Sequence, residues 1–145
     1  MITAEGPKRH LLEGVEILNG VLSSHGFVFQ LGACDKGSGG WFASGSYRRG
    51  ERELELHFRG SLGLVTYHIG DDSLDHETYM RFVGAYGQNQ YPGFPKEPIE
   101  SFMHLASDIS NYCTDFVSGD GSQFRAWAQE IRQNPMKFKG IGAIG

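Results

Sequence analysis

The feature that most constrains the fold is an alternation of side chains between residues 53 and 69. Two runs, 53–59 and 62–69, flank Gly60-Ser61, and glycine at the first position of a two-residue loop is typical of a type II′ β-hairpin. This loop places Glu53 opposite His68, and a one-residue slip would move every side chain to the other face. The register predicts an apolar face made of Leu54, Leu56, Phe58, Val65, Tyr67 and Ile69.

The opposite face of the same hairpin is polar. When the register is extended through the turn at Arg49-Gly50 to residues 41–47, three more side chains (Trp41, Ala43 and Tyr47) join the apolar face. The other face is expected to stay in contact with water. It carries Phe42, Ser44, Ser46, Glu53, Glu55, His57, Arg59, Leu62, Leu64, Thr66 and His68.

The patterns along the rest of the chain predict one α+β domain over residues 1–145. We expect a four-stranded antiparallel meander with helices packed on one face, in the order α-β-β-β-β-α-α-α. The first strand covers about 27–33, and the glycine-rich turn after it leaves its register open. Asp72 or Ser73 is expected to cap the second helix. Helices are expected at about 7–25, 73–83, 98–118 and 122–133, followed by a loose tail at 136–145.

The first helix has an apolar stripe but two weak positions. Leu11, Val15 and Leu18 recur at helical spacing. Gly14 and Gly20 interrupt the sequence, and each glycine costs roughly 1 kcal/mol relative to alanine in a helix. The helix is therefore expected to depend on packing against the rest of the domain.

Composition excludes several classes of function. The chain has 13 basic and 17 acidic side chains and a formal net charge of −4, and its basic runs stop at Lys8-Arg9 and Arg48-Arg49. Nucleic-acid binding needs clustered lysine and arginine, so no nucleic-acid partner is expected.

No apolar run reaches the length of a membrane span, and the N-terminus lacks a basic-then-apolar leader. The protein is expected in the cytoplasm, with Cys34 and Cys113 reduced, buried and inert.

The densest group of candidate ligands lies around the end of the fourth predicted strand. His68, Asp72 and His76 combine imidazole and carboxylate groups that could bind a divalent metal. Their spacing matches no metal-site template, and a capped helix start with one sheet histidine explains the same residues. A small-molecule-binding or metal-dependent hydrolytic domain using His57, His68 and His76 is therefore the alternative hypothesis. The favoured expectation is that the protein has no cofactor.

Three other sets of residues have competing interpretations. Glu100, His104 and Asp108 recur every four residues on the predicted 98–118 helix and are interpreted as its solvated face. Tyr91 and Phe94 could fill the seam between sheet and helices or form a recognition patch. A third functional hypothesis is a homodimer in which the last helix, bearing Trp127, completes a core across the interface.

Several segments resemble small, uncharacterised bacterial α+β proteins. They are Leu56-His-Phe-Arg-Gly-Ser-Leu-Gly-Leu-Val-Thr-Tyr67, Asp75-His-Glu-Thr-Tyr-Met80, Tyr91-Pro-Gly-Phe94 and Asp115-Phe-Val-Ser-Gly119. Some proteins of this kind are similar to immunity proteins, which neutralise a cognate toxin. The resemblance covers about half of the chain and implies no particular site residue. It implies a role in which the protein binds another protein.

No motif in the chain identifies a reaction, so the leading hypothesis is a non-enzymatic protein-binding domain, for which the resemblance implies an immunity-like role. The polar sheet face interleaves charged and apolar side chains in the way that protein interfaces do. The expected partner is a protein of unknown identity. The predicted binding residues are Phe42, Glu53, Glu55, His57, Arg59, Leu64 and His68, with Asp71 and Asp72 in the neighbouring turn.

Overall fold

The computed structural model describes residues 3–135 as an α+β fold built on one antiparallel sheet. The predicted tail at 136–145 lies outside the described residues. The sheet has the order β1-β2-β3-β5-β6, and the short strand β4 also pairs with β3. The strands are β1 (Val28–Gly37), β2 (Gly40–Arg49), β3 (Arg52–Arg59), β4 (Ser61–Leu62), β5 (Thr66–Ile69) and β6 (Asp72–Asp75).

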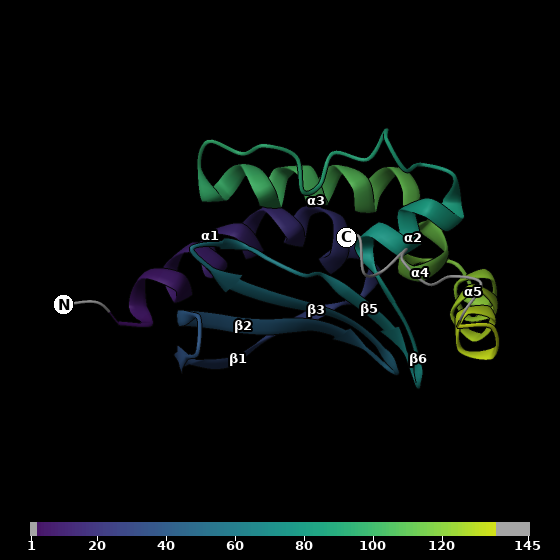
Figure 1. Ribbon diagram of the computed structural model, residues 1–145, viewed down its shortest axis with the longest axis horizontal. Helices are drawn as coiled ribbons and strands as arrows, with labels where there is room; N and C mark the ends of the chain where they lie inside the picture. Colours follow the sequence, from purple (N-terminus) through teal and green to yellow (C-terminus); the bar gives the residue numbers. More distant parts are fainter. Residues whose placement is uncertain (1–2, 136–145) are drawn as a thin grey trace.

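The helices lie on one side of this sheet. The two longest, α1 (Glu5–Leu22) and α3 (Pro98–Tyr112), run beside each other over the sheet, while α5 (Ser122–Gln133) lies near β6 (Figure 1). The remaining helices are η1 (Ser23–His25), α2 (His76–Val83) and α4 (Thr114–Val117). Among residues 3–135, no helix is both long and apolar enough to cross a membrane.

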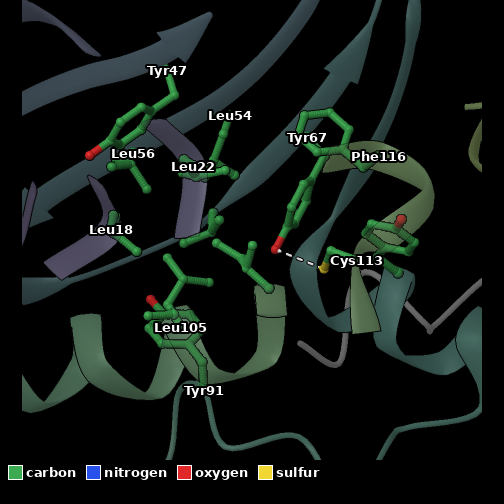
Figure 2. Close-up of a cluster of buried hydrophobic side chains, with 14 of the residues drawn as sticks. Leu18, Leu22, Tyr47, Leu54, Leu56, Tyr67, Tyr91, Leu105, Cys113 and Phe116 are labelled. Atoms are coloured by element: carbon green, nitrogen blue, oxygen red, sulfur yellow. Dashed lines mark hydrogen bonds between the residues drawn. The ribbon is translucent and has the colours of Figure 1, made fainter. Parts of the chain in front are cut away.

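The register predicted for the central strands is confirmed. In the structure Glu53 pairs with His68 and Glu55 with Thr66, and Tyr47 on β2 pairs with Leu54. The apolar face forms the core, where the side chains of β3 and β5 meet those of α1 and α3 (Figure 2). The core residues of these two strands are all 2% exposed or less: Leu54, Leu56, Phe58, Tyr67 and Ile69.

The predicted fourth strand, 62–69, is interrupted, which corrects the prediction of an even hairpin. Phe58 pairs with Leu62, one residue out of step with the pairing of Glu55 and Thr66. The segment between Leu62 and Thr66 therefore has one residue more than the segment of β3 opposite it. The irregularity lies near Gly63, whose backbone N–H donates to the carbonyl of His57 (2.9 Å). Leu62 therefore lies in the core and not on the polar face, while Leu64 is exposed.

A further strand, β6, replaces the predicted start of the second helix. Ile69 pairs with Asp72 across Gly70-Asp71, and Gly70 has a positive φ of 60°, a conformation that glycine adopts readily. The helix α2 begins only at His76. Its cap is Asp75, whose carboxylate accepts a hydrogen bond from the backbone N–H of Thr78 (2.8 Å), so the prediction of Asp72 or Ser73 as the cap is wrong.

The strand β1 forms one edge of the sheet and is irregular. It has ten residues, eight of which pair with β2, and the register shifts between Leu31 and Cys34. Such a β-bulge bends the strand and increases its twist. The register that the sequence left open is therefore not a single one, because it changes by one residue within the strand.

The two longest helices pack closely where α1 carries Gly14. A Cβ atom at this position would lie 2.3 Å from the ring of Phe102 on α3, so only glycine permits the present approach. Gly20, by contrast, has no neighbour within 4 Å of such a Cβ. The predicted dependence of α1 on packing thus has a definite contact at Gly14.

Helix α3 begins where the sequence predicts and ends earlier. Pro98 is its first residue, and Glu97 and Glu100 form a reciprocal capping box. The predicted 98–118 helix is divided at Cys113 into α3 and the short α4. The fold therefore has the predicted α+β class and helical core, with corrections to the last strands of the sheet, to the start of α2 and to the end of α3.

Candidate functional site

The polar face of the sheet contains an ordered stack of three side chains. The ring of His57 on β3 stacks on Phe42 of β2, with centroids 5.0 Å apart and planes 23° apart. The guanidinium of Arg59 lies 5.8 Å from the centroid of the same phenyl ring, within the range of a cation–π contact. We call these three residues the Phe42 stack.

The environment of His57 favours its neutral form. Partial burial lowers the pKa of His57 below its ordinary value, and the nearby positive charge of Arg59 lowers it further. Because the ordinary value is about 6.5, the imidazole is neutral at pH 7. The Phe42 stack therefore carries one positive charge, that of Arg59.

Two carboxylates of the polar face lie on the half of β3 that pairs with β5. Glu53 forms an ion pair with Arg48 (3.0 Å), and Glu55 contacts His68 (2.9 Å). The side chain of Glu55 remains 57% exposed. No carboxylate among residues 3–135 lies within ion-pair distance of Arg59. The face thus has a cationic, aromatic end at the Phe42 stack and an acidic part around Glu55.

The two aspartates predicted beside this face have different environments. Asp71 is exposed. Asp72 is 4% exposed and forms an ion pair with Arg132 of α5 (2.7 Å). Asp72 therefore links β6 to α5 through an ion pair. Because it is buried, it is not available on the predicted binding surface.

The histidines of the alternative hypothesis do not form one site. His57 and His68 lie on the polar face, whereas His76 is buried at the start of α2. No cluster of three or more potential metal-ligating side chains occurs among the described residues. The candidate metal set His68, Asp72 and His76 is therefore not brought together.

Instead, His76 belongs to a buried hydrogen-bond chain. Its Nε2 lies 2.9 Å from Oδ2 of Asp108, and its Nδ1 lies 2.7 Å from the hydroxyl of Tyr67. The thiol of Cys113 contacts the same hydroxyl at 3.6 Å (dashed line in Figure 2). A neutral imidazole with its proton on Nε2 satisfies all of these partners, because Nε2–H donates to Asp108 while Nδ1 accepts from Tyr67.

Asp108 is the centre of this buried chain, which corrects the prediction of a solvated residue. It is 0% exposed and accepts hydrogen bonds from the backbone N–H groups of Gln90 (2.7 Å) and Tyr91 (2.8 Å). Its carboxylate thus joins α3 to α2 and to the loop after α2. Leu105 is also buried and lies three positions before Asp108, so the two residues share a helical face. This spacing is the sequence signal that could have placed Asp108 in the core.

Trp127, on which the homodimer hypothesis depends, packs against side chains of its own chain, and the homodimer stays a prediction. In the structure Trp127 stacks on Phe82 of the same chain (centroids 5.2 Å, planes 13° apart) and makes an edge contact with Tyr79. These contacts supply a core for Trp127 without a second copy. Of the two loop aromatics, Tyr91 is buried and Phe94 is fully exposed.

The two cysteines should differ in reactivity. Cys113 is 0% exposed, and burial raises the pKa of its thiol to about 12, so almost none is present as the reactive thiolate near pH 8. Cys34 is only half-buried, which corrects the expectation that both cysteines are buried. We expect iodoacetamide to modify Cys34 in the native protein while Cys113 stays protected, as measured by mass spectrometry of tryptic peptides. Modification of both cysteines in urea is the control, and equal native rates would contradict the burial of Cys113.

Comparison with known proteins finds no family model, no curated protein and no solved structure that matches this chain.

Proposed function

We propose that this chain is a non-enzymatic protein-binding domain that recognises its partner through the polar face of the sheet. The observation that carries the proposal is the Phe42 stack, an aromatic ring in contact with an imidazole and with a guanidinium that forms no ion pair among residues 3–135, on a face that none of the described helices covers. Aromatic and arginine side chains are enriched among the residues that dominate binding energy. Because strands β2 and β3 hold the stack, little side-chain freedom is lost on binding.

The charges of the face suggest the chemistry of the partner. A partner surface with a carboxylate facing Arg59 and basic side chains facing Glu55 would be complementary to it. Such complementarity speeds encounter and fixes orientation. The immunity-like role that the resemblance implies is one case of this function, since an inhibitor needs a complementary surface and no catalytic group.

Site-specific crosslinking in the cells that make the protein tests the position of the surface. Photoactivatable benzoylphenylalanine replaces Ser73, which is exposed on β6 and pairs with His68 of the polar face. The matched control replaces Glu13, which is exposed on α1. We expect a discrete crosslinked protein from position 73 and none from position 13. A product at position 13 alone, or none at either position, would show that the surface is wrongly assigned.

The protein crosslinked at position 73 then serves as the purified partner in calorimetry. Phe42→Ala and Arg59→Ala should each weaken its Kd about 30-fold, as loss of a binding hot spot of about 2 kcal/mol does. Arg9→Ala, on the exposed side of α1, should leave the Kd unchanged. Affinities that are equal for all three variants would refute the role of the Phe42 stack.

A further inference from the structure

The turn between β1 and β2 lies against the guanidinium of Arg59. Ser38 and Gly39 form this turn, at the end of the antiparallel pairing of the two strands. A Cβ atom at Gly39 would lie 1.9 Å from Nη1 of Arg59 and 2.8 Å from its Cζ. Any side chain at position 39 would therefore overlap the guanidinium where it now lies, so glycine is required for this arrangement.

Arg59 also lies close to Gly37, the last residue of β1. A Cβ atom at Gly37 would lie 3.4 Å from Nη2 of Arg59 and 3.4 Å from Cε1 of Phe42. We call Gly37 and Gly39 the glycine pair. Because Arg59 lies against the glycine pair as well as the phenyl ring of Phe42, its side chain has less freedom than the long side chain of an ordinary exposed arginine.

The charge of this confined arginine is available to a partner. Arg59 is exposed and forms no ion pair with another residue of the range 3–135, whereas Arg48 of the same face is paired with Glu53. A guanidinium presents its N–H donors as a planar fork that binds a carboxylate or a phosphate through two parallel hydrogen bonds. A phosphate group carries about two negative charges at neutral pH, so the single positive charge of the Phe42 stack is better matched to a carboxylate.

We infer that the glycine pair positions Arg59 to bind the carboxylate of an acidic side chain on the partner protein. This inference rests on the proposed function and adds Gly39 to it as a positioning residue. Ordering of a flexible side chain is one of the costs of association, and here the side chain is ordered before the partner arrives. Gly39→Ala should therefore weaken binding by displacing Arg59, although it removes no group that contacts the partner.

The fold should tolerate this substitution. Gly39 is not one of the glycines with a positive φ, so alanine fits its backbone conformation. The added methyl group meets the end of a flexible side chain, which can move toward solvent. The Tm of Gly39→Ala should thus stay close to that of the unaltered protein.

Two small probes test the carboxylate site on the unaltered protein without the partner. Benzoate and benzamide have the same ring and nearly the same shape, but only benzoate carries a carboxylate. Titrations at constant ionic strength are followed by the side-chain ¹H–¹⁵Nε signal of Arg59 and the amide signal of Phe42. We expect benzoate to bind with a Kd about ten-fold lower than that of benzamide, the effect of a charge-assisted hydrogen bond. Equal Kd values, or no shift of either signal at the highest soluble benzoate concentration, would overturn the inference.

Two variants and one further measurement test the role of Gly39. Gly39→Ala should raise the Kd of benzoate about ten-fold, to that of benzamide. Gly20→Ala adds the same methyl group on α1, where it has no neighbour within 4 Å, and should leave both Kd values unchanged. Undiminished benzoate binding by Gly39→Ala would refute the positioning role. In the unaltered protein, nuclear Overhauser contacts between the Gly39 Hα protons and the Arg59 guanidinium protons are expected, and their absence would refute it independently of any variant.

These results can be distinguished from a failure of the proposed function. If benzoate binds as expected but position 73 yields no crosslinked protein, the carboxylate site stands and the assignment of a protein partner is overturned. With a purified partner, a Kd that rises for Arg59→Ala and is unchanged for Gly39→Ala would overturn the positioning role and leave the proposed function intact. Weakening by both variants would support the inference.

Discussion

Replacing Asp108 with alanine should lower the free energy of unfolding by about 3–5 kcal/mol, the usual cost of removing one member of a buried polar pair. The carboxylate accepts hydrogen bonds from His76 and from the backbone of Gln90 and Tyr91. Its loss would leave all three donors buried or half-buried without an acceptor. Urea unfolding followed by circular dichroism measures the change.

Two further variants separate this effect from a general loss of acidic charge. Asp108→Asn retains one carbonyl acceptor and should lose less stability than Asp108→Ala. Asp71→Ala removes an exposed carboxylate and should change stability by no more than about 0.5 kcal/mol. A loss below about 1 kcal/mol for Asp108→Ala would contradict the buried network.

Two alanine substitutions in α1 should have opposite effects on stability. Gly20→Ala should stabilise the protein by up to about 1 kcal/mol, because alanine favours the helix and no atom lies within 4 Å of the added Cβ. Gly14→Ala should give a net loss of about 1–2 kcal/mol, because overpacking against Phe102 outweighs the same helical gain.

Thermal and urea unfolding of the two variants, each compared with the unaltered protein, measure this difference. The pair is internally controlled, since the substitution and the helix are the same at both positions. Stabilisation by both alanines would mean that α1 and α3 are not in close contact at Gly14.

The central hairpin could be predicted because its two faces differ strongly in polarity. Leu54, Leu56 and Tyr67 could share a buried face in only one register, and the structure has that register. The slip at Leu62 could not be predicted in the same way, because both Leu62 and Leu64 are apolar and either could face the core. Strand β6 was missed although Gly70-Asp71 between Ile69 and Asp72 is a recognisable two-residue loop.

The polar face was predictable for the same reason as the core, since successive residues of a strand point to opposite sides. The buried chain of Asp108 and His76 was not, because its members are 32 positions apart and each has an ordinary explanation in its own segment. Their contact depends on where α3 lies relative to α2. Local patterns do not contain that information.

The bulge in β1 has a consequence for the protein at high concentration. A long edge strand offers unpaired backbone groups that could template the addition of another chain. In β1 the shift between Leu31 and Cys34 breaks the even spacing of those groups, so a second molecule could not continue the sheet along the whole strand. The irregularity thus opposes the formation of fibres by addition of strands along the edge of β1.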